Sequence, residues 1–134
     1  MRRLSLAVVG ADHPNKSGPA RRFEIAMCVA GEPIYLVPEP KNPVDPRAIA
    51  VYSARHIQIG YVRAERAQFI GTALSRGGLL AIFQEPARWG ATIRVHLDGT
   101  TPVLPEAQDG RAYDWPPPGS DDADWWPDET YDDE

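Results

Sequence analysis

Turn-forming residues interrupt this sequence so often that long regular segments have little room. The 134 residues include 14 prolines and 11 glycines, and both residue types favour turns over helices and strands. Between them lie short apolar segments that we predict to be strands, at residues 4–10, 23–29, 34–39, 49–53, 58–62, 79–84 and 91–97. Short strands at close spacing indicate a small barrel or a rolled sheet.

A helical pattern appears in a single segment, residues 64–76. Ala67, Ile70 and Leu74 recur there at helical spacing, and Gly77 supplies a C-terminal stop. We expect residues 49–53 and 58–62 to form a hairpin around the polar residues between them. About 100 residues are enough to enclose one hydrophobic core, so we expect one folded domain at residues 1–104.

Charge divides the sequence into a basic part and an acidic part. Residues 1–104 contain 13 Lys/Arg and 8 Asp/Glu, a net charge of +5, within a chain whose total is −5. Residues 105–134 contain one Arg and 11 Asp/Glu, a net charge of −10, and no helix or strand periodicity. We therefore predict an acidic tail that is disordered or only locally ordered. The basic part favours nucleic acid as a partner, the alternative being arginines that are solvated or paired with acids.

Patterns that support catalysis or metal binding are scarce. Cys28 is the only cysteine, which excludes an intramolecular disulfide and a multi-cysteine zinc site and suits a reducing, cytoplasmic setting. His13, His56 and His96 are far apart, and no nucleotide-binding P-loop motif occurs. The longest apolar runs are too short to cross a bilayer. We expect a non-enzymatic, cytoplasmic protein without a cofactor or a metal.

Prolines are concentrated between the third and fourth predicted strands. Residues 38–46 contain four of them, and Asn42 and Asp45 each precede one, an arrangement that initiates turns. One interpretation is a rigid turn in which Asn42 and Asp45 hydrogen-bond to their own backbone. The other is a binding loop that is already ordered, so that ordering it costs no affinity.

This segment carries a family resemblance. The run N-P-V-D-P-R-A-I at residues 42–49, followed by Q-I-G-Y-V at residues 58–62 and then the helix, resembles the HIRAN domain. The resemblance extends over about residues 4–97 and implies a mainly β fold, a small OB-like or SH3-like β-barrel of about six strands with one α-helix. It also implies a module that recognises single-stranded DNA or a DNA 3′ end, in DNA repair or replication restart.

The resemblance assigns roles to residues before and within the proline-rich loop. Asp45 matches the family's Asp that contacts the terminal 3′-hydroxyl, and Val44 stands where the DNA-binding members have a base-stacking aromatic. Asp12 and His13 fall at the family's basic and aromatic pair after the first strand. The imidazole of His13 is flat and can stack on a base.

Further roles fall at the fifth strand and the start of the helix. Tyr61 can stack or hydrogen-bond, and Arg63 and Arg66 correspond to basic residues that hold phosphates. The predicted nucleic-acid-binding residues are therefore His13, Asn42, Val44, Asp45, Arg47, Tyr61, Arg63 and Arg66.

The tail combines acids with tryptophans. Trp115, Trp125 and Trp126 lie among aspartates, although a tail that only adds solubility does not need tryptophans. Alternating carboxylates and flat rings imitate phosphates and bases, so this segment is suited to occupy the groove of its own barrel. The alternative is a hook for a partner protein, which would make the chain a protein-interaction adaptor.

Overall fold

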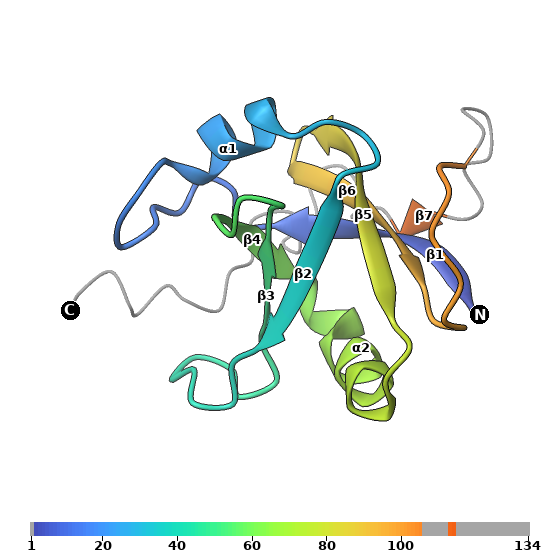
Figure 1. Cartoon of the computed structure of the whole chain (residues 1–134). Helices are drawn as coiled ribbons and strands as arrows, with labels where there is room; N and C mark the ends of the chain where they lie inside the picture. The colour runs from blue at the N-terminus through green and yellow to red at the C-terminus, as the bar shows by residue number, and fades with distance from the viewer. Residues whose placement is uncertain (1, 106–112, 115–134) are drawn as a thin grey trace.

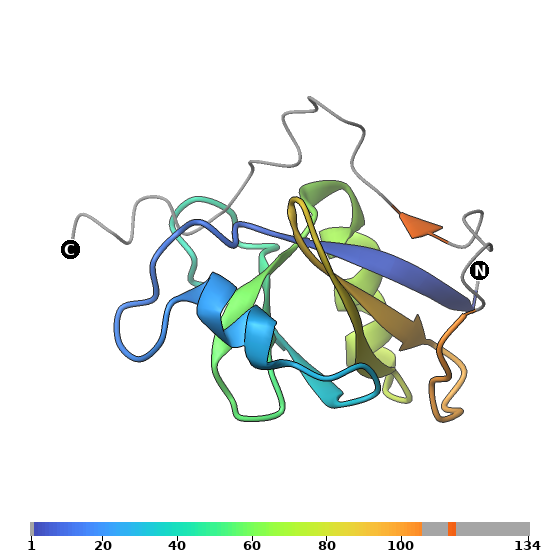
Figure 2. The same cartoon turned by 90° about the horizontal axis from the view of Figure 1, so that it is seen from above.

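The structure, a computed structural model, describes residues 2–105 and 113–114, and in this part of the chain six strands form a closed barrel with two helices (Figures 1 and 2). The barrel strands are β1 (Arg3–Val9), β2 (Pro33–Pro38), β3 (Ile49–Tyr52), β4 (Gln58–Val62), β5 (Leu80–Ala87) and β6 (Gly90–His96). The helices are α1 (Arg21–Met27) and α2 (Ala64–Arg76), and a short strand β7 (Tyr113–Asp114) follows. The predicted mainly β barrel is confirmed.

Closure of the barrel depends on the pairing of β1 with β4. The strand order is β4-β3-β2-β5-β6-β1, and β1 returns to pair antiparallel with β4, with Val9 opposite Tyr61. At this seam a Cβ built on Gly60 would lie 2.4 Å from the carbonyl oxygen of Val9, and the φ of Gly60 is +155°. Only glycine allows so close an approach in that conformation, so closure of the barrel explains the glycine before Tyr61.

Alternate residues of the strands fill the barrel. Leu4, Leu6 and Val8 of β1 point inward and are at most 1% exposed, and Ile93 and Val95 of β6 belong to the same core. Side chains of a strand point alternately to its two faces. The residues of β1 between these three are also buried, so both faces of this strand are covered.

Helix α2 occupies the predicted residues 64–76. Its buried residues are Ala67 and Ile70, and Ile70 is part of the barrel core. The helix ends at Gly77, whose φ of +83° suits glycine. The predicted hairpin of residues 49–53 and 58–62 is also confirmed, as β3 and β4.

The strand predicted at residues 23–29 is wrong, because this segment forms α1, and the described part of the chain therefore has two helices rather than one. The buried residues of α1 are Arg21, Glu24 and Ile25, at helical spacing, whereas Phe23 and Met27 are exposed. Most of the buried residues of this helix are charged, so the positions of the apolar residues do not reveal its buried face. The apolar residues instead alternate along the sequence, as they do in a strand. Hydropathy alone therefore favoured a strand here.

Among residues 2–105 and 113–114, no helix is long and apolar enough to cross a membrane. Most of the predicted tail, including Trp115, Trp125 and Trp126, lies outside the described residues, although residues 113–114 form β7. The domain boundary at residue 104 stays a prediction.

Candidate nucleic-acid interface

The proline-rich loop between β2 and β3 is organised by its own side chains. The side-chain oxygen of Asn42 accepts hydrogen bonds from the backbone N–H groups of Val44 (2.8 Å) and Asp45 (3.2 Å). Asp45 Oδ1 accepts one from the N–H of Arg47 at 2.8 Å, and the Asp45 carbonyl accepts one from Ala48 at 3.0 Å. The loop is therefore a rigid turn, as the first interpretation of its prolines predicts.

The same loop is joined to β4 through Glu39. The hydroxyl of Tyr61 donates to Glu39 Oε1 at 2.6 Å, and Asn42 Nδ2 donates to that oxygen at 3.0 Å. The guanidinium carbon of Arg21 lies 5.6 Å from the centroid of the Tyr61 ring. Tyr61 is only 1% exposed, so in this structure its ring forms the base of the site.

The loop between β1 and α1 is fastened on the other side of Tyr61. Asn15 Nδ2 donates to the carbonyl of Gln58 at 3.0 Å, and Asn15 Oδ1 accepts from Arg21 Nε at 2.8 Å. Arg21 is only 1% exposed, and its Nη1 also donates to the carbonyl of Gly10 at 3.0 Å. These bonds hold a buried cation beside the outer face of β4.

A cleft of about 490 Å³ separates this loop from the outer faces of β3 and β4. Charged and polar groups predominate among the residues that line it, which include Lys16, Arg21, Glu39, Tyr52, His56 and Gln58. Burial raises the pKa of the Tyr52 hydroxyl, and the nearby Glu39 carboxylate raises it further. The Tyr52 hydroxyl is therefore neutral at physiological pH and can donate a hydrogen bond.

Two of the predicted phosphate-binding arginines lie at the start of α2. Arg63 precedes the helix, is 8% exposed, and its Nη2 lies 3.2 Å from Glu65 Oε2. Arg66 is half-buried in the first turn. Because Tyr61 and Arg63 are two residues apart, the start of α2 lies next to the base of the site.

The predicted residues after β1 lie in a turn in which the His13 N–H donates to the Gly10 carbonyl at 3.2 Å. His13 is half-buried, and the neighbouring Asp12 is exposed and bonds to Arg22. The hydrogen bond from Arg22 lowers the pKa of the Asp12 carboxyl. Arg22 therefore offsets the negative charge that Asp12 brings to a position that is basic in the family.

Val44 and Arg47 are exposed on the β2–β3 loop, close to Asp45 in sequence, whereas Asn42 is only 4% exposed. The structure thus brings Asn42, Asp45 and Tyr61 into one network through Glu39. The nucleic-acid contacts predicted for all eight residues remain predictions.

The sequence interpretation missed a group of rings beside the cleft. Tyr35 of β2 is paired with Tyr52 of β3 in the sheet register. The ring of His56 stacks on that of Tyr35, with centroids 4.9 Å apart and an interplanar angle of 11°. In the sequence, Tyr35 and Tyr52 each follow a core residue of a predicted strand, and this was the available signal. The pairing of separate strands is needed to place the two tyrosines together.

Comparison with known proteins identifies the fold independently. A family model of the HIRAN domain matches residues 7–92. The chain belongs to the HIRAN domain family. No curated protein matches the sequence.

Two solved structures resemble this HIRAN domain. The HIRAN domain of human HLTF superposes with a TM-score of 0.51 and 21% identity, over 71% of this chain and 72% of that one. A protein from Lactobacillus plantarum superposes with a TM-score of 0.52 and 19% identity, over 72% of this chain and 93% of that one. At such low identity these likenesses show the fold of the HIRAN domain.

Proposed function

We propose that this chain is a non-enzymatic nucleic-acid-binding module that recognises single-stranded DNA at a 3′ end. Membership of the HIRAN family supports nucleic-acid binding at the level of the family. The net charge of +5 on residues 1–104 supports a polyanionic partner. A role in DNA repair or replication restart is the setting that this activity suits.

The orientation of the Asp45 carboxylate is the observation on which this proposal mainly depends. Asp45 is half-buried, and the N–H of Arg47 fixes its Oδ1. Within the described residues, Asp45 Oδ2 makes no hydrogen bond. An oriented carboxylate oxygen is suited to accept a charge-assisted hydrogen bond from a terminal hydroxyl.

The phosphates of the bound DNA strand would contact arginines of the β2–β3 loop and of the start of α2. Arg47 is exposed on the same loop, and Arg63 and Arg66 begin α2, whose N-terminus carries a partial positive charge. The Arg63–Glu65 ion pair offsets part of this charge. We therefore expect only a few phosphate contacts.

Fluorescence anisotropy with 5′-labelled oligonucleotides tests the proposal. Single strands should bind more tightly than duplexes, with a log–log salt slope of about −2 to −4, because each phosphate contact on a single strand contributes roughly −0.7. Arg47→Glu should weaken binding and flatten the slope. Arg76→Glu, which reverses an exposed arginine at the far end of α2, is the matched control. Absence of binding at low salt would overturn the proposal.

The adaptor function remains as the alternative. It depends on Trp115, Trp125 and Trp126, which lie outside the described residues. No feature of the described barrel favours a partner protein over nucleic acid.

A further inference from the structure

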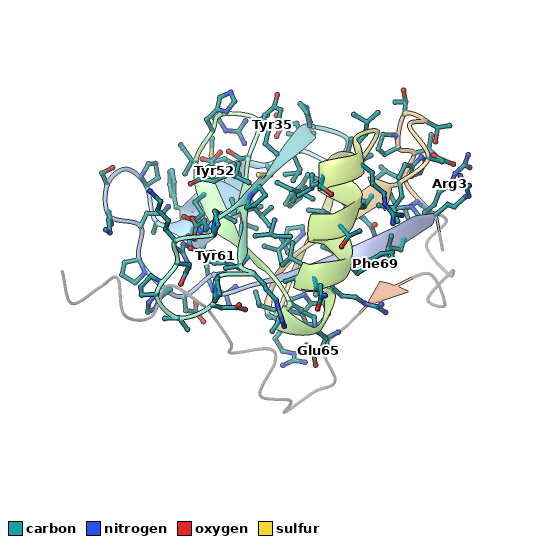
Figure 3. All side chains as sticks on the ribbon, turned by 90° about the horizontal axis from the view of Figure 1, so that it is seen from below. Arg3, Tyr35, Tyr52, Tyr61, Glu65 and Phe69 are labelled. Atoms are coloured by element: carbon teal, nitrogen blue, oxygen red, sulfur yellow. The ribbon has the colours of Figure 1, made fainter. Side chains whose placement is uncertain are left out.

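Aromatic side chains form a row on the outer face of β2, β3 and β4. Tyr35 lies opposite Tyr52, and Tyr52 lies opposite Gln58, so these three side chains share one cross-strand row. In the adjacent row, Ala50 lies opposite Tyr61. Figure 3 shows Tyr35, Tyr52 and Tyr61 along the same side of the barrel.

The ring of His56 extends this row beyond the end of β3. His56 has a φ of +64° and is the only non-glycine residue with a positive φ among the described residues. This conformation is uncommon for a side chain with a Cβ. The adjacent Arg55 is held by Glu24 of α1 (2.6 Å) and by Glu32 of the α1–β2 loop (3.1 Å), which fixes the turn against both segments. The stack of His56 on Tyr35 is therefore set before any ligand arrives.

Single exposed aromatics are ordinary on protein surfaces. This row differs because it borders a cleft to which Lys16 and Arg21 bring positive charge, with Glu39 as the opposing acid. The Glu39 carboxylate already accepts hydrogen bonds from Tyr61 and Asn42. Rings beside a cationic cleft are the combination that binds single strands, since bases stack on rings and cations attract phosphates.

The row also lies within reach of the proposed 3′-end site. Strand β3 runs from the β2–β3 loop, which carries Asp45, to the turn that carries His56. Its four residues span ~13 Å at about 3.3 Å per residue. Residues 48–51 are buried, but the cleft beside β3 is lined by Glu39 of the β2–β3 loop and by Tyr52 and His56. A strand whose end contacts Asp45 can therefore follow this cleft toward Tyr35.

We propose that Tyr35, Tyr52 and His56 form a second subsite, on which a base upstream of the 3′ end stacks while its phosphate faces the cleft. The proposal rests on the proposed function, since it extends the same strand. The ligand is therefore a single-stranded nucleic acid that is long enough to contact the β2–β3 loop and α2 at its 3′ end and to reach this second subsite as well.

The test compares short and long oligothymidylates, of about 3 and about 10 nucleotides, a range that brackets the smaller sites on barrels of this kind. The variant Tyr35→Ala/His56→Gly removes both stacked rings, and glycine accepts the left-handed conformation at residue 56. The control is Phe69→Ala on α2, because Phe69 and Tyr35 are each 41% exposed. Thermal melting of the full-length chains verifies that each variant folds.

Loss of one stacking platform should weaken binding of the long oligonucleotide about tenfold and leave binding of the short one unchanged. The Phe69→Ala chain should bind both as the wild type does. Equal binding of the long oligonucleotide by the double variant and the wild type would overturn the subsite and leave the proposed function standing. If the wild type binds neither oligonucleotide at low salt, the proposed function and the subsite both fail.

Discussion

Asp45 combines a structural contact with a proposed ligand contact in one carboxylate. Its Oδ1 holds the turn through Arg47, and its Oδ2 is the acceptor that we assign to the 3′-hydroxyl. An alanine at this position would remove both contacts at once. Asparagine retains an oxygen that can accept the Arg47 N–H, whereas its NH2 group replaces Oδ2, so the charge and the acceptor for the 3′-hydroxyl are both lost.

We expect Asp45→Asn to weaken binding of a single strand with a free 3′-hydroxyl about tenfold, because hydrogen bonds to charged groups contribute more than neutral ones. Binding of the same strand with a 3′-phosphate should not weaken. The ratio of the two dissociation constants, measured by anisotropy, is the readout. An unchanged ratio in a variant that melts like the wild type would mean that Asp45 serves only the turn.

Helix α1 depends on contacts with the rest of the molecule. It has seven residues, too few to be stable alone. Its buried Glu24 accepts hydrogen bonds from Ser53 Oγ at 2.7 Å and from Arg55 Nε at 2.6 Å. These bonds join α1 to the turn between β3 and β4, which is the turn that places His56.

We expect Arg55→Met to lower the free energy of unfolding and the urea midpoint, because the buried Glu24 carboxylate would lose its counter-ion. Arg55 is itself 39% exposed in its side chain, so solvent moderates the loss. Urea denaturation measures the change. Arg47→Met replaces an exposed arginine without a carboxylate partner among the described residues and should change stability little. Equal stability of both variants would contradict the role of Arg55.

At the scale of the whole molecule, β7 joins a part of the acidic segment to the barrel. It runs parallel to β1, with Asp114 opposite Leu6, along the edge of β1 that β4 occupies from Val8 onward (Figure 2). Val8 lies opposite Val62, the residue before Arg63. Asp114, the last described residue, is therefore paired with β1 two residues before the point where β1 meets β4. Residues 115–134 follow it in the sequence and contain eight Asp/Glu and no Lys/Arg.

We expect removal of residues 115–134 to raise affinity for single-stranded DNA severalfold at low salt. A tethered tail can reach an effective concentration of about a millimolar at the site. Replacing Trp125 and Trp126 by alanine should recover a large part of the gain, because screened surface charges attract only weakly. Substituting Asn for Asp121, Asp122 and Asp124 separates the contribution of charge. Equal affinities of the full-length and shortened chains at low salt would exclude competition by the tail.

The sequence by itself determined the elements whose signals are local. Strand β1, the β3–β4 hairpin and α2 follow from hydrophobic periodicity and from glycines and prolines at their ends. The turn roles of Asn42 and Asp45 were also readable, because these side chains bond to backbone groups within three residues. Resemblance to the HIRAN domain added a barrel of about six strands, whereas the order of its strands came from the structure.

Only the tertiary structure decided α1 and the cleft. The buried face of α1 carries Arg21 and Glu24, whose burial is favourable only where Gly10, Ser53 and Arg55 supply partners. The cleft and its rings come from the β1–α1 loop, β2, β3 and the turn before β4. Such a site depends on strand register and barrel closure, which are set by contacts between residues far apart in the chain, and local periodicity carries no record of those contacts.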